Sequence, residues 1–116
     1  MGKAANSSIS LKQIHVTDNF WNKYVHLVKD VIIPYQWDIL NDKLEDVETS
    51  HCIENFKIAA GEKEGEFQGA VFQDTDVAKW LEAVGFVLNY ERDEKLEELA
   101  DETIELIGRA QQPDGY

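Results

Sequence analysis

The sequence has 116 residues, of which 43% are hydrophobic, and a formal net charge of −12 at pH 7. This length suits one small domain or part of a larger one, and the apolar share is too high for a disordered chain. The negative charge argues against nucleic acid and anionic membranes as partners, because binding to either normally needs a basic surface. No stretch approaches the roughly 18 apolar residues that a membrane-spanning helix needs, so we expect no membrane partner.

The N-terminal residues 1–10 are small and polar, and we interpret them as a flexible N-terminus without the apolar segment of a signal peptide. With no export signal visible, we expect a cytoplasmic protein. Apolar and polar residues alternate in Ile9–Lys12, and the alternation resumes one step out of phase at Ile14–Val16. This pattern predicts a short edge strand with a bulge.

The next segment predicts two helices. Apolar residues recur at three- and four-residue steps from Asp18 to Ile33, which indicates an amphipathic helix with its N-cap at Thr17-Asp18. Pro34 either kinks this helix or begins the next one, which we expect to reach about Asn41.

An acidic segment, residues 42–49, is predicted to be a solvated loop. A third helix is expected over residues 51–60, with Ser50 as a possible N-cap and Gly61 as its end. Residues 62–69 then predict an irregular loop.

The strongest helical pattern covers residues 75–90, and acids precede it where the helix dipole favours negative charge. Three residues, Glu91–Asp93, connect it to a last helix with one apolar and one acidic face. Such a short connection predicts an antiparallel αα-hairpin. The Pro113–Gly115 segment has turn chemistry, which is useful where more chain follows, so we expect part of a longer protein.

Few residues predict chemistry by themselves. Cys52 is the only cysteine, so it forms no internal disulfide, and we interpret it as a buried side chain rather than a reactive thiol. The three histidines are scattered without metal-ligand spacing, and we predict no metal site in this sequence. The row of acids on the last helix is interpreted as its solvated face.

Two polar segments are candidate binding sites. Gln73, Asp74 and Asp76 precede or begin a strong helix, where they act either as helix caps or as ligand-binding groups. Pro34–Trp37 combines aromatic rings with the amide of Gln36, which suits either contact with a sugar or ordinary core packing of the rings.

Three segments in order resemble the N-terminal part of glycoside hydrolase family 127, the β-L-arabinofuranosidases. They are Val31–Trp37 (VIIPYQW), Val71–Ala83 (VFQDTDVAKWLEA) and Arg109–Tyr116 (RAQQPDGY). Residues 17–21 and 51–62 also fit. The resemblance implies an all-α fold in which helical hairpins form the first part of an (α/α)6 barrel. Residues 11–116 would then be the N-terminal part of a catalytic domain.

The resemblance implies a retaining, exo-acting glycosidase that removes β-linked L-arabinofuranose. Its nucleophile would be a zinc-bound cysteine thiolate and its acid/base a glutamate, all located beyond this sequence. We therefore expect zinc in the full-length protein, no catalytic residue here, and no activity of this chain alone. The resemblance assigns part of the sugar pocket to this chain: Phe72 and Asp74 first, Gln73 and Asp76 beside them, then Gln36, Trp37 and His51.

The alternative hypothesis is a free-standing acidic helical module that binds a partner protein. In either case one hairpin and a few shorter helices cannot close a barrel. Apolar helix faces should then remain exposed, and we expect them to favour self-association.

Overall fold

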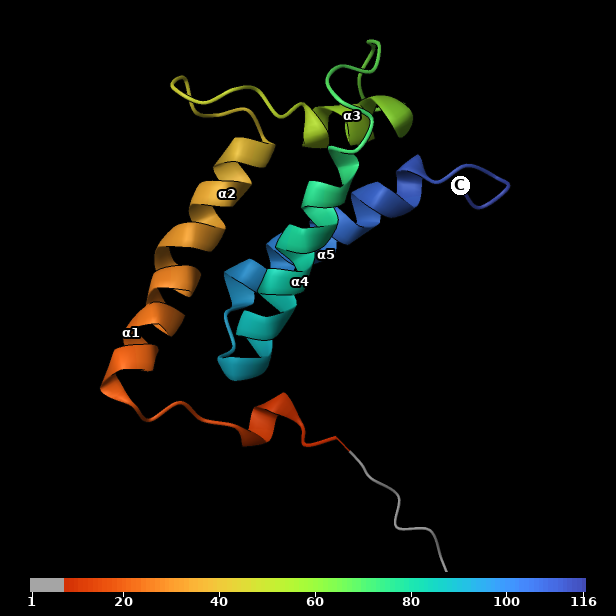
Figure 1. Ribbon diagram of the computed structural model, residues 1–116. Coiled ribbons are helices and arrows are strands. Elements are labelled where there is room, and N and C mark those ends of the chain that lie inside the picture. The colour runs from red at the N-terminus through yellow and green to blue at the C-terminus, as the bar shows by residue number, and fades with distance from the viewer. Residues whose placement is uncertain (1–7) are drawn as a thin grey trace, which may run out of the picture.

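The computed structural model describes residues 8–116, and regular structure in this range is helical (Figure 1). The elements are the 3-10 helix η1 (Leu11–Gln13), α1 (Asn19–Leu27), the π-helix η2 (Val28–Ile32), α2 (Ile33–Leu40), α3 (Cys52–Ala59), α4 (Asp74–Tyr90) and α5 (Glu94–Ala110). The predicted mostly-helical fold class is confirmed.

The predicted N-terminal edge strand is wrong, because residues 8–116 contain no strand and Leu11–Gln13 form a 3-10 turn. In this turn the Gln13 amide donates to the Ser10 carbonyl at 2.9 Å, and the Ile14 amide donates to the Leu11 carbonyl at 3.1 Å. A strand needs a neighbouring strand to satisfy its backbone, whereas a turn satisfies part of it locally. Of the N-terminus predicted to be flexible, residues 1–7 lie outside the described part.

The first long helix runs from α1 through η2 into α2 without a loop (Figure 1). Asp18 caps it, as predicted: its carboxylate accepts from the amides of Phe20 at 2.9 Å and Trp21 at 3.0 Å. Pro34 lies in the first turn of α2. Proline lacks the N–H and its ring crowds the carbonyl four residues back, so the wider π-helical spacing just before it relieves that clash.

Helix α3 begins at Cys52 after His51, which has a left-handed backbone with φ 54°. The prediction that Ser50 caps this helix is wrong, because no side-chain hydrogen bond caps it. The preceding loop supplies the acceptor instead: the Asp42 carboxylate accepts hydrogen bonds from the backbone amides of Ser50 and His51. The predicted end at Gly61 is confirmed, and its φ of 74° lies in the left-handed region that glycine adopts most readily.

Helices α4 and α5 form the predicted antiparallel hairpin (Figure 1). Asp93 begins α5 as its N-cap and accepts from the Leu96 amide at 3.1 Å. Helix α4 is central, since it packs against α2, α3, α5 and η1.

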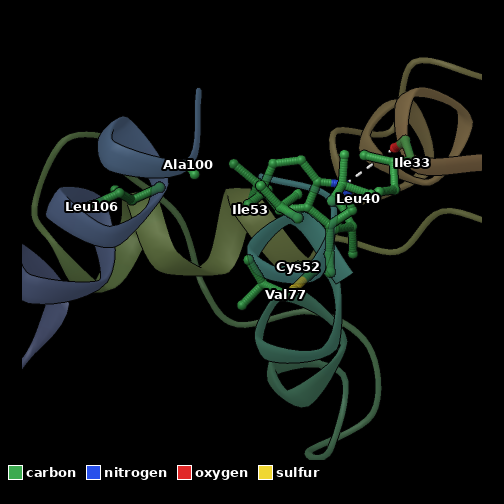
Figure 2. Close-up of a cluster of buried hydrophobic side chains, with 10 residues drawn as sticks. Ile33, Leu40, Cys52, Ile53, Val77, Ala100 and Leu106 are labelled. Atoms are coloured by element: carbon green, nitrogen blue, oxygen red, sulfur yellow. Dashed lines mark hydrogen bonds between the residues drawn. The ribbon is translucent and has the colours of Figure 1, made fainter. Parts of the chain in front are cut away.

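The core lies where α4 meets α2, α3 and α5. Figure 2 shows Ile33 and Leu40 from α2 beside Cys52 and Val77, with Ala100 and Leu106 of α5 on the opposite side. The core residues are Ile33, Leu40, Cys52, Ile53, Val77, Trp80, Val84, Val87, Ala100 and Leu106. Trp80 is 2% exposed, and its indole Nε1–H donates to the Ile33 carbonyl at 3.1 Å, which ties α4 to the start of α2.

Large apolar faces remain open, as the sequence predicts. The aromatic cluster of α1, formed by Phe20, Trp21 and Tyr24, is exposed, and its rings contact one another. The radius of gyration is 17.7 Å, against about 13 Å for a compact chain of roughly 100 residues. The helices of residues 8–116 are all too short or too polar to cross a membrane.

Candidate functional site

A pocket lined by both polar and apolar residues lies between α2, the segment before α3 and the start of α4, with a volume of about 390 Å³. It is lined by Gln36, Ile39, Leu40, Glu48, Thr49, Ser50, Gln73, Asp76, Lys79 and Trp80. Three elements that are distant in the sequence therefore form its walls. The buried Trp80 lies behind this pocket in the core, where its indole is held by the hydrogen bond to the Ile33 carbonyl.

The pocket brings together three residues that the sequence singles out: Gln36, Gln73 and Asp76. Gln36 projects from α2, whereas Asp76 lies in the first turn of α4 and pairs with the Lys79 ammonium at 3.0 Å. These side chains supply amide donors, amide acceptors and a carboxylate to one concave surface. Such a set can bind the hydroxyl groups of a small polar ligand.

Gln73 is held by the loop before α4. Its Oε1 accepts from the Ala70 amide at 2.8 Å. Gly69 permits this arrangement for two reasons: its φ is 92°, and a Cβ at this position would collide with Gln73 Oε1. Replacing Gly69 with a larger residue should therefore displace Gln73 from the pocket wall.

The other four candidate residues lie elsewhere. Phe72 is 68% exposed, and Asp74 lines a different, more apolar hollow with Phe67, Val71 and Tyr116. Trp37 is half-buried and packs on Trp80 at a ring-centroid distance of 4.5 Å. The His51 Nδ1 lies 3.6 Å from an Asp42 oxygen. The seven residues thus do not form one site, and a binding role for these four stays a prediction.

Sequence reasoning missed the acidic loop as part of the pocket. Residues 42–49 were predicted only as solvated, yet Glu48 and Thr49 line the pocket together with Ser50. No periodic pattern identifies such residues, because their placement depends on where the loop returns to α3. The only local signal is Asp42, an acid in a turn that follows a helix.

The match to a family model decides the classification. The model described as "Beta-L-arabinofuranosidase, GH127 catalytic domain" matches residues 13–116. The chain belongs to glycoside hydrolase family 127.

Two family 127 relatives support this assignment. A non-reducing end beta-L-arabinofuranosidase of Bifidobacterium longum subsp. longum is 41% identical over 115 residues, covering 89% of this chain and 18% of that protein. The crystal structure of a GH127 beta-L-arabinofuranosidase from Geobacillus stearothermophilus T6 is 62% identical, with a TM-score of 0.86. That match covers 88% of this chain and 16% of the solved chain. The chain therefore spans less than a fifth of the length of either relative.

Cys52 is the only cysteine of this family 127 chain, and its side chain is buried as part of the core. It is 1% exposed, and its Sγ donates to the Gln73 carbonyl at 3.2 Å, which joins the start of α3 to the segment before α4. Burial, together with the nearby carboxylates of Asp76 and Asp74, raises the pKa of the thiol to about 11, although a backbone hydrogen bond with Val77 opposes the shift. The interpretation of Cys52 as a buried side chain is confirmed.

The family resemblance also implies a zinc site, and we ask whether the His, Cys, Asp and Glu side chains of this chain could form one. Among residues 8–116, no three His, Cys, Asp or Glu side chains gather into a group able to hold a metal ion. The donor set of the described part therefore does not fit the zinc site, and we derive no reaction step through the metal.

Proposed function

We propose that this chain forms one wall of the sugar-binding pocket of a β-L-arabinofuranosidase, and that it cleaves no glycosidic bond by itself. The observation that carries the proposal is the convergence of Gln36, Gln73 and Asp76 on one pocket. Family membership and the names of both relatives support an L-arabinofuranoside as the ligand.

The chemistry of the pocket suits a small neutral sugar. Amides donate and accept hydrogen bonds, and the carboxylates of Asp76 and Glu48 accept from hydroxyl groups. The half-buried Ile39 adds apolar surface that fits the C–H face of a sugar ring, while Leu40 and Trp80, 5% and 2% exposed, support the pocket from the core. The volume of about 390 Å³ lies at the lower end of the range typical of small-molecule sites.

The same residues support the proposal that this chain alone performs no catalysis. A thiolate nucleophile requires a lowered pKa and access to the substrate, whereas Cys52 is buried and its pKa is raised to about 11. Asp76, the pocket acid on α4, is paired with Lys79. We propose that the nucleophile, the acid/base and the zinc ligands belong to the rest of a longer protein.

Saturation-transfer NMR tests sugar binding, because it detects the weak affinity expected of a single pocket wall. Methyl β-L-arabinofuranoside should receive saturation from the 116-residue chain, and Gln36→Ala should reduce the transfer at least about threefold. Gln68→Ala is the matched control, since Gln68 is exposed and outside the pocket. Equal transfer from both variants, or none from the unmodified chain, would refute the proposed wall.

A turnover assay tests the second half of the proposal. The chain incubated with zinc and a chromogenic β-L-arabinofuranoside should release no product above the protein-free rate. Release that depends on protein concentration would show that the chain holds its own catalytic groups.

A further inference from the structure

The acidic loop, residues 42–49, leaves α2 and returns to α3 beside the pocket. Its last two residues, Glu48 and Thr49, line the pocket together with Ser50, and α2 and the start of α4 form the other two walls. The loop has no regular secondary structure, and its residues Asp46 and Glu48 are exposed. Contacts other than those of a helix or strand must therefore fix the position of this third wall.

Asp42 closes the base of the loop. Its Oδ1 accepts from the Ser50 amide at 2.6 Å and from the His51 amide at 3.1 Å, while its Oδ2 is 3.0 Å from the same His51 nitrogen. The His51 Nδ1 lies 3.6 Å from Oδ2. The side chain of Asp42 is 17% exposed, so water competes weakly for these bonds.

The backbone at both ends of the loop is unusual as well. Asp42 and His51 both have φ 54°, and they are the only non-glycine residues with positive φ in the described part of the chain. A left-handed conformation is costly for most residues and persists only where other contacts enforce it. Here the enforcing contact is the carboxylate of one strained residue bound to the amide of the other.

We infer that Asp42 is a positioning residue, which fixes Glu48, Thr49 and Ser50 as the third wall of the pocket and so sets how the pocket fits its sugar. The inference rests on the proposed function for the identity of the ligand. The clamp itself, meaning the hydrogen bonds from Ser50 and His51 to Asp42, is independent of any ligand. Because of this separation, the two ideas can fail separately.

The test compares three variants of the 116-residue chain. Asp42→Gly removes the carboxylate without backbone strain, since glycine adopts φ 54° freely. Asp42→Asn keeps one oxygen acceptor and a residue type that tolerates the left-handed region, so it should restore part of the clamp. Asp46→Gly makes the same chemical change at an exposed position of the loop and serves as the control.

Amide hydrogen exchange reads the clamp without a ligand. Asp42→Gly should raise exchange at Ser50 and His51 at least about tenfold, with Asp42→Asn intermediate and Asp46→Gly unchanged. Exchange within α4 should stay constant, which shows that the fold survives. An unchanged rate in Asp42→Gly, or an equal rise in Asp46→Gly, would overturn the inference.

Titration with methyl β-L-arabinofuranoside reads the consequence for the pocket. Asp42→Gly should weaken binding by at least about fivefold, and Asp42→Asn should recover part of the loss. Binding that is unaffected in Asp42→Gly, despite faster exchange, would overturn the role of the loop in ligand fit. If the unmodified chain binds no sugar, the proposed function fails, while the exchange data still decide whether Asp42 clamps the loop.

Discussion

Trp80 is the largest fully buried side chain among residues 8–116, so its replacement gives the sharpest stability prediction. The side chain is 2% exposed, lies against Trp37 with ring centroids 4.5 Å apart, and donates a hydrogen bond to the Ile33 carbonyl. Removing a buried aromatic side chain typically costs about 3–5 kcal/mol. The lost hydrogen bond lies partly within that figure, so we expect Trp80→Ala to lower the free energy of unfolding by about 4 kcal/mol.

Two further tryptophan variants separate the causes. Trp80→Phe keeps an aromatic ring beside Trp37 and loses the indole donor, for which we expect a loss of about 1–2 kcal/mol. Trp21→Ala removes the same residue type from an exposed site, 62% accessible, and should cost no more than about 1 kcal/mol. Urea unfolding followed by circular dichroism measures all three. A loss below about 1 kcal/mol for Trp80→Ala would refute the view that this residue joins α2 to α4.

The remaining predictions concern Cys52, Asp18 and the open face of α1. Burial raises the pKa of Cys52 in the folded chain to about 11, so the thiol ionises at lower pH in the unfolded chain. The free energy of unfolding should therefore fall as the pH rises from 9 towards 11. An equal fall in a Cys52→Ala variant would contradict this. Asp18→Ala should cost about 1 kcal/mol of unfolding free energy by removing the cap of α1, whereas an unchanged urea midpoint would count against the cap. The exposed aromatic cluster of α1 should cause concentration-dependent self-association, which Trp21→Glu reduces; light scattering that shows a monomer throughout would disprove it.

The helices were predictable because their signals are local. The spacing of apolar residues gives the buried face of α4 directly, and the acids at its start indicate where it begins. The three-residue connection to α5 predicts the hairpin. The N-terminal segment failed for the opposite reason. Alternation at Ile9–Val16 suits a strand only where a partner strand exists, and tertiary context decides that.

The pocket was only partly predictable. Gln36 stands between two aromatic residues within α2, and Gln73 directly precedes the strongest helical pattern, so the sequence could nominate both. The contribution of Glu48 depends on the clamp between Asp42 and His51, which joins residues nine positions apart through an irregular loop. Such a contact has no periodicity, and only the folded backbone reveals it. Phe72 and Trp37 are neighbours of pocket residues in the sequence but lie outside the pocket. Phe72 is exposed in the turn before α4, and Trp37 packs on Trp80.

We propose that Gln36 and Gln73 belong to one sugar-binding pocket, and their side-chain amide signals test this most directly. In a ¹⁵N-labelled chain titrated with methyl β-L-arabinofuranoside, both NH₂ pairs should shift along one saturating curve, while the exposed Asn89 amide stays in place. Shifts confined to residues outside the pocket, or separate curves for Gln36 and Gln73, would contradict the account.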